Sequence, residues 1–194
     1  MSLHADTGRA QDGILDRLLV GIDALCRVAA WGAAAVLAAL FLLGLAEILL
    51  RNLFGYSLPI AVEYSGYLVG ISLLLGSGWT LQQGGQIRVG LLIERLGPAG
   101  RRAVDTAATV FALVTALFLA AALVRYTGGT ALRGTVSYFP SQTPLVIPQA
   151  LLAAGPVTLA LALLARLVRL LRGDGPDGTG TPSRPDSTAA EDGS

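Results

Sequence analysis

Three ionisable residues stand beside long apolar stretches of the chain, where a charge is costly and is a functional candidate by default. Glu47 precedes Arg51 by four residues, so on a helix the two side chains share one face. Glu63 opens the next apolar stretch. A membrane carboxylate of this kind can bind a proton or a cation. The alternative, which we favour, is structural: neither Glu lies in the middle of a stretch, so both are expected near the membrane interface, neutralised by Arg51 or Arg125.

The rare residue types exclude several classes of protein. The chain has one cysteine, Cys26, and one histidine, His4, so it can form neither an internal disulfide nor a multi-cysteine metal site. A haem-bearing membrane anchor needs histidine ligands within the bilayer, and His4 lies in a polar N-terminal stretch. A GxxxxGK[ST] phosphate-binding loop is also missing from the sequence. We therefore expect no cofactor, no metal and no enzymatic activity.

Composition points to a membrane protein. Hydrophobic residues make up 53% of the 194 residues and charged residues only 14%, well below the usual share of a soluble domain. The 14 basic residues, all Arg, nearly balance 13 acidic ones, which excludes a nucleic-acid binder.

Four apolar stretches are long enough to cross a bilayer as helices, which takes about 20 residues each. The predicted spans are about 28–50, 64–81, 103–124 and 145–165. They are continuous runs of Leu, Ala, Val and Gly without the alternation of barrel strands. The first begins too late and is too long for a cleaved signal peptide. The sequence therefore predicts an all-α integral membrane four-helix bundle.

The flanks of these spans complete the predicted organisation. Residues 1–12 form a polar N-terminal segment, residues 13–172 the four-span membrane domain, and residues 173–194 a disordered cytoplasmic tail with almost no apolar residues to bury. Apolar residues recur at helical spacing over 14–25 and again over 89–96. This amphipathic pattern predicts two short interfacial helices.

Orientation follows from the arginines. Eleven lie on the flanks that the two termini share with the middle loop, and only Arg51, Arg125 and Arg133 lie on the other side. The positive-inside rule therefore predicts that both termini are cytoplasmic. The interfacial aromatic residues agree, because Trp31 and Trp79 fall at the cytoplasmic ends of their spans and the five tyrosines at the external ends. Within the second span, Gly66 and Gly70 form a GxxxG motif, which predicts a close helix–helix contact within the chain or with another chain.

The order of three segments resembles a known family. They are Arg51-Asn-Leu-Phe-Gly, Pro59-Ile-Ala-Val-Glu63-Tyr-Ser-Gly-Tyr-Leu68 and Gly84-Gly-Gln-Ile-Arg-Val89. With a proline-containing fourth span, this order is similar to the small permease subunit, DctQ type, of tripartite ATP-independent periplasmic (TRAP) transporters. The resemblance covers about residues 13–170. In this sequence Gln86 stands where that family usually has His, and Gly90 where it usually has Asp.

The resemblance implies a division of labour among three components. A large permease subunit contains the substrate and sodium sites, and a periplasmic solute receptor delivers an organic acid. The small subunit packs beside the large one in the bacterial inner membrane as a non-catalytic scaffold of this ion-gradient-driven uptake system. Candidates for fixing helix ends or contacting the large subunit are Arg51, Glu63, Gly66, Gly70, Gln86 and Arg88. The sequence does not name the solute.

Two alternative functions stay open at this point. A self-contained dimeric exporter could cycle a proton on Glu47, although that reading calls for a carboxylate in mid-span and Glu47 precedes only three residues of its predicted span. A membrane anchor for a redox enzyme is disfavoured because the predicted spans contain no histidine.

Overall fold

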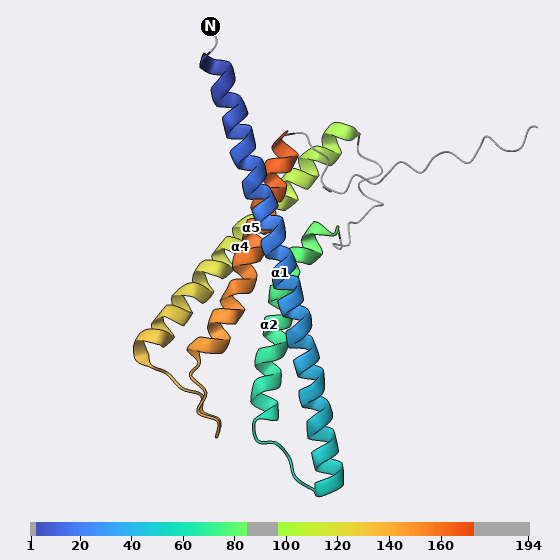
Figure 1. The fold of residues 1–194 in the computed structure, drawn as a ribbon, viewed down its shortest axis with the longest axis vertical. Coiled ribbons are helices and arrows are strands. Elements are labelled where there is room, and N and C mark those ends of the chain that lie inside the picture. The colour runs from blue at the N-terminus through green and yellow to red at the C-terminus, as the bar shows by residue number, and fades with distance from the viewer. Residues whose placement is uncertain (1–2, 85–96, 173–194) are drawn as a thin grey trace, which may run out of the picture.

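The protein is all-helical, as the sequence predicts (Figure 1). The computed structural model describes residues 3–84 and 97–172, with side chains for 15–84 and for 97–172 except 98, 99 and 101. Its helices are α1 (Leu3–Phe54), α2 (Ala61–Gln82), α4 (Pro98–Arg133) and α5 (Val146–Arg172). Within the described ranges, the one β feature is an isolated bridge between Val136 and Pro144.

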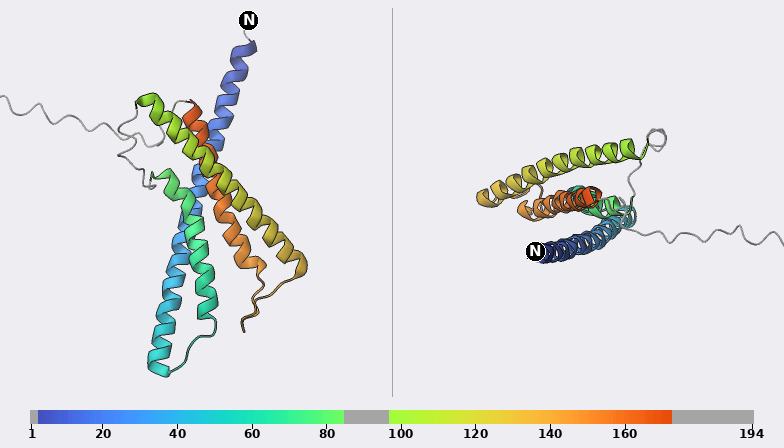
Figure 2. Two further views of the ribbon diagram at one scale, coloured as in Figure 1. Left: turned by 180° about the vertical axis from the view of Figure 1, so that it is seen from behind. Right: turned by 90° about the horizontal axis from the view of Figure 1, so that it is seen from above.

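Helices α2 and α5 form the centre of the bundle. Helix α1 packs against α2 and, less extensively, against α5, whereas α4 packs against α5. Figure 2 shows the resulting layers from above, with α1 on one side of the α2–α5 pair and α4 on the other. The chain therefore consists of two helical hairpins, α1–α2 and α4–α5, joined through their inner helices.

Glycine and proline residues mark several of the helix ends. Gly55 follows the last residue of α1 with a φ of 66°, and Gly134 follows the last residue of α4 with a φ of 58°. Both lie in the left-handed region, which glycine adopts without strain, and such a residue commonly ends a helix. Pro98 opens α4, where its missing N–H is not needed.

The separate interfacial helix expected over residues 14–25 is wrong, because these residues belong to the continuous helix α1. No proline interrupts the backbone hydrogen bonds between the amphipathic segment and the apolar stretch that follows. Of the apolar residues in the amphipathic segment, Ile22 packs against the buried cluster, whereas Leu15, Leu18 and Leu25 stay exposed, and the buried side of α1 begins at Cys26. With 52 residues, α1 is about 78 Å long, far more than a bilayer core requires. The second interfacial helix, predicted over 89–96, lies outside the described residues.

Three helical segments in the described part of the chain are long and apolar enough to cross a membrane, namely Leu15–Phe54, Arg102–Arg133 and Val146–Arg172. They contain three of the four predicted spans. The remaining one, 64–81, coincides with α2, whose serines and glycines dilute its apolar character. At 22 residues α2 is about 33 Å long, enough to span the hydrocarbon core.

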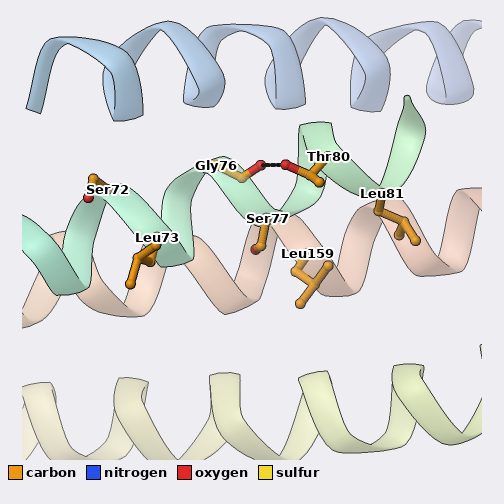
Figure 3. Close-up of a pocket in the computed structure, with 7 residues that line it drawn as sticks. All are labelled: Ser72, Leu73, Gly76, Ser77, Thr80, Leu81 and Leu159. Carbon is orange, nitrogen blue, oxygen red and sulfur yellow. Dashed lines mark hydrogen bonds between the residues drawn. The ribbon is translucent and has the colours of Figure 1, made fainter. Parts of the chain in front are cut away.

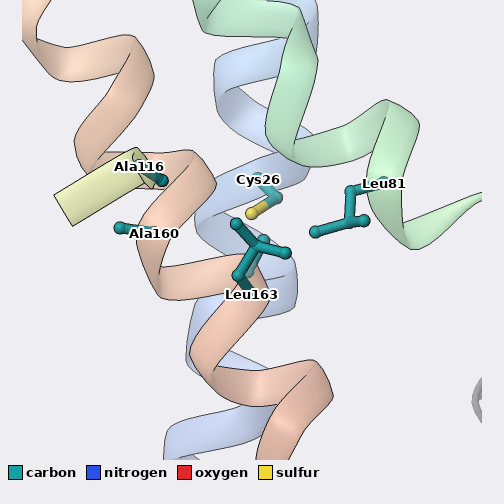
Figure 4. Close-up of a cluster of buried hydrophobic side chains, with 6 residues drawn as sticks. Cys26, Leu81, Ala116, Ala160 and Leu163 are labelled. Atoms are coloured by element: carbon teal, nitrogen blue, oxygen red, sulfur yellow. The ribbon is translucent and has the colours of Figure 1, made fainter. Parts of the chain in front are cut away.

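Small residues let the central helices approach closely. A Cβ atom at Gly155 of α5 would lie 2.5 Å from the Leu74 Cβ and 2.6 Å from the Leu74 carbonyl carbon on α2. In addition to this contact, a buried cluster joins all four helices around the fully buried Cys26 (Figure 4). Its members are Cys26, Leu81, Ala116, Ala160, Ala162 and Leu163. Because several members are alanines, the bundle depends on backbone proximity more than on large side chains.

Candidate functional site

Glu63 is the most deeply buried acidic side chain among the described residues, with 4% of its surface exposed. It lies in the first turn of α2, and Tyr67 follows one helical turn later. The Tyr67 hydroxyl donates a hydrogen bond to Glu63 Oε1 at 3.1 Å, and the Ser141 hydroxyl donates one to Glu63 Oε2. Since Ser141 lies in the connection between α4 and α5, this carboxylate joins the two hairpins.

The connection over residues 134–145 is a short, internally bonded loop. The Ser137 N–H donates to the Thr143 carbonyl at 2.9 Å, and the Leu145 N–H donates to the Thr135 carbonyl at 3.2 Å. Thr143 also shares a 2.9 Å hydrogen bond with the Tyr64 hydroxyl of α2. The loop therefore contacts α2 through a group that we call the Glu63 cluster, made of Glu63, Tyr64, Tyr67, Ser141 and Thr143.

Hydroxyl groups, not arginines, satisfy the Glu63 carboxylate. The ion pairs within the described residues join Arg169 to Asp23 and Arg172 to Asp16, so neither Arg51 nor Arg125 forms one with Glu63. Donors aimed at both oxygens compensate for the water that a carboxylate loses on burial. The expectation of arginine neutralisation is therefore wrong for Glu63, and hydroxyl donors take the place of the arginines.

Glu47 has a local structural role. Its Oε1 accepts a hydrogen bond from the Ser57 hydroxyl at 2.5 Å, and its Oε2 accepts one from the Leu58 N–H at 2.7 Å. Both donors lie in the connection between α1 and α2. Although Arg51 is spaced one turn away, the two side chains form no ion pair in the described part of the chain. Glu47 thus holds the α1–α2 connection in place.

Of the remaining candidate residues, the structure describes Gly66, Gly70 and Arg51. Gly70 faces α5, where a Cβ atom would meet the Leu152 Cδ2 at 2.8 Å, whereas a Cβ at Gly66 would meet nothing within 4 Å. One half of the GxxxG motif therefore serves an internal contact. Arg51 is exposed. Gln86 and Arg88 lie outside the described residues.

A second polar group, which the sequence analysis did not identify, lies at the opposite end of the bundle. Asp23 of α1 accepts a 2.9 Å hydrogen bond from Gln82 at the end of α2 and forms a 2.6 Å ion pair with Arg169 of α5. One carboxylate of α1 therefore binds the ends of α2 and α5, and we call Asp23, Gln82 and Arg169 the Asp23 cluster. Nearby, Arg172 pairs with Asp16 at 2.9 Å. The only signal in the sequence was that Asp16 and Asp23 lie on the polar side of an amphipathic segment, opposite its apolar residues.

Comparison with known proteins identifies the family. The family model of the DctQ component of tripartite ATP-independent periplasmic transporters matches residues 40–173, more than half of the chain. The chain belongs to the DctQ family. This confirms the resemblance seen in the sequence, and the protein is a multi-pass membrane subunit of a TRAP transporter and not an enzyme. No curated protein sequence matches the chain.

The two polar groups of this DctQ protein differ in how much of each the family model covers. All members of the Glu63 cluster lie within the matched residues, whereas Asp16 and Asp23 lie before them. The Asp23 cluster thus combines residues from inside and outside the matched region.

A shallow groove of about 420 Å³ lies along α2 of the DctQ subunit, lined by α2 residues and by Leu159 of α5 (Figure 3). Its hydroxyl groups are already engaged. Ser77 donates to the Leu74 carbonyl at 2.6 Å, and Thr80 donates to the Gly76 carbonyl at 3.1 Å. No charged residue lines the groove. An organic acid would find no cationic partner there, so the groove is not suited to hold such a substrate.

Proposed function

We propose that this DctQ subunit is the non-catalytic scaffold of a TRAP transporter for organic acids in the bacterial inner membrane. Its partners would be a large permease subunit that carries the substrate and ion sites, and a periplasmic solute receptor. One observation carries the proposal: in the described helices, charged side chains gather near the two ends of the bundle and are absent from mid-span. A substrate or coupling-ion site at the membrane midplane requires polar groups that these helices do not present.

The proposed topology has four spans, about 28–50, 64–81, 103–124 and 145–165, with both termini cytoplasmic. The arginine distribution supports this orientation. The two polar groups lie at opposite ends of the bundle, as four spans require, because Asp23 of α1 contacts the predicted cytoplasmic ends of α2 and α5, and the Glu63 cluster gathers predicted external segments. Fusions of a reporter active only in the cytoplasm to residue 56 and to residue 172 test it. The second fusion alone should be active.

The outer faces of the bundle are suited to lipid and to a larger neighbour. Phe41 on α1 and Phe111 and Phe118 on α4 are all largely exposed. An apolar surface of this extent indicates a membrane or protein partner. Among the candidate residues, exposed Arg51 and Gly66 remain proposed contacts with the large subunit. Gln86 and Arg88 remain proposed contacts as well.

Replacing Glu63 with leucine is expected to lower the yield of the assembled transporter several-fold. The substitution removes the acceptor of the Tyr67 and Ser141 hydroxyls, so the 134–145 loop keeps only its Thr143–Tyr64 hydrogen bond to α2. Co-purification of the large subunit with the tagged variant measures assembly, and uptake kinetics measure substrate affinity. The affinity of whatever complex forms should match that of the unmodified transporter. Normal assembly combined with an altered sodium dependence of uptake would contradict the scaffold role of Glu63.

Reconstitution tests the proposed function as a whole. The chain alone in liposomes is expected to carry no solute and no protons, and uptake should require the large subunit and the receptor. A Glu47→Gln variant should leave the ion dependence of that uptake unchanged, because Glu47 only bonds the α1–α2 connection. Drug-driven proton flux by the chain alone, lost in Glu47→Gln, would instead establish a self-contained exporter and overturn the proposal.

A further inference from the structure

Both tryptophans of the chain lie beside one arginine. The Arg27 guanidinium carbon on α1 lies 5.8 Å from the ring centre of Trp79 on α2, close enough for a cation–π interaction. Trp31 follows Arg27 by one helical turn, so it lies on the same face of α1, and it is 74% exposed. The chain has only these two tryptophans. The exposed Arg27 guanidinium thus lies over one indole, and the second indole lies one turn further along the same face of α1.

Arg27 differs from Arg169 and Arg172, whose guanidiniums pair with carboxylates of α1. At the same end of the bundle, Arg169 pairs with Asp23 and Arg172 with Asp16. Asp23 lies one turn before Arg27 but is already bound by Arg169 and Gln82. In the described part of the chain, Arg27 forms no ion pair. Its charge is held against an indole and is available to an anion from outside the chain.

We propose that Arg27, Trp31 and Trp79 bind the headgroup of an anionic phospholipid. A guanidinium matches the oxygens of a phosphodiester and can bind two of them at once. Indoles favour the depth of the headgroups and the glycerol backbone. Arg27 immediately precedes the predicted span 28–50, which places its charge at the phosphate layer. This binding goes beyond the scaffold function, because a scaffold requires no particular lipid.

The surroundings favour a lipid over free phosphate or a protein carboxylate. Val28, next to Arg27, is exposed, as is Trp31. They offer apolar surface to the glycerol and acyl part of a lipid, which free phosphate lacks. On the predicted orientation the site faces the cytoplasmic leaflet, where anionic lipids attract basic residues.

Fluorescence of one tryptophan tests the site. The full chain carrying Trp31→Phe, which keeps an aromatic ring at that position, leaves Trp79 as the reporter. In nanodiscs, phosphatidylglycerol with brominated acyl chains should quench Trp79 with an association constant about fivefold higher than brominated phosphatidylcholine, the factor typical of one basic residue at a charged lipid surface. Arg27→Gln should abolish this difference. The matched control is Arg17→Gln, which removes another exposed arginine of α1 and should leave the difference intact.

Four outcomes would overturn the proposal. They are equal quenching by the two lipids in the parent chain, a preference that survives Arg27→Gln, a preference that Arg17→Gln removes equally, and displacement of the lipid by millimolar inorganic phosphate.

If the lipids quench equally and Arg27→Gln reduces recovery of the large subunit, Arg27 binds a protein carboxylate instead. Should Arg27→Gln expose Cys26 and so prove unfolded, Arg27→Lys decides the matter. Lysine keeps the positive charge but lacks the planar guanidinium that lies over Trp79. The preference of Arg27→Lys for phosphatidylglycerol should therefore be weaker than that of the parent chain, and an equal preference would overturn the proposal.

Discussion

Replacing Gly155 with leucine is expected to force α2 and α5 apart and to lower the free energy of unfolding by about 3 kcal/mol. A Cβ at this position would lie 2.5 Å from the Leu74 Cβ and 2.6 Å from its carbonyl carbon. One of these atoms is backbone, so rotation of a side chain cannot relieve the overlap. The contact also joins the two hairpins, so its loss affects the whole bundle.

The single buried cysteine provides the measurement. Cys26 has no exposed surface, so a thiol-reactive dye labels it when the bundle unfolds on heating in detergent. Gly155→Leu should lower the midpoint of this labelling clearly. Gly66→Leu is the matched control, because a Cβ at Gly66 would meet nothing within 4 Å. Equal midpoints for the two variants would show that the α2–α5 approach does not limit stability.

Replacing Asp23 with leucine is expected to have the next largest effect, a loss of about 2 kcal/mol of unfolding free energy. The substitution removes the shared acceptor of Gln82 and Arg169 and leaves a partly buried guanidinium without its carboxylate. Helix α1 then loses its polar contacts with the ends of α2 and α5 at once. Asp23→Asn should lose less, because the amide oxygen still accepts one hydrogen bond.

Asp16 offers a control of the same charge on the same helix. Its ion pair with Arg172 is of similar length, but the Asp16 side chain is 66% exposed and bonds a single partner. An exposed pair contributes at most about 1 kcal/mol. The labelling midpoint of Cys26 should therefore fall further for Asp23→Leu than for Asp16→Leu. The reverse order would mean that the Asp23 cluster is not a main contact between α1, α2 and α5.

Local signals in the sequence predicted the helices and the family. The apolar runs predicted helices, and the glycines at 55 and 134 and the proline at 98 lie at helix ends as such residues usually do. The segments around Arg51, Glu63 and Gln86, with the proline-containing fourth span, suggested the DctQ family, which the family model confirms. Among the helices in the described residues, the amphipathic segment before residue 28 was misread, because its pattern fits a separate interfacial helix and the first part of a longer helix equally well.

Contacts between distant residues could not be predicted in the same way. Ser141 lies 78 residues from Glu63, and Arg169 lies 146 residues from Asp23. Helical periodicity says which residues share a face but not which faces meet. For Glu63 the sequence suggested an arginine, because charge neutralisation is the usual expectation at the membrane edge. In the folded chain, two hydroxyls perform that task, and serine and tyrosine are too common to be singled out by spacing.

The separation of Glu63 from Ser141 bears on how the subunit is made. Synthesis runs from the N-terminus, so α1 and α2 enter the translocon before Ser141 and α5, which contact α2, have been translated. Until the second hairpin arrives, the Glu63 carboxylate lacks its serine donor, and the glycine-lined side of α2 has no α5 to cover it. The first hairpin is therefore an unfinished insertion intermediate, and we expect quality-control proteases to degrade a chain that stops after α2.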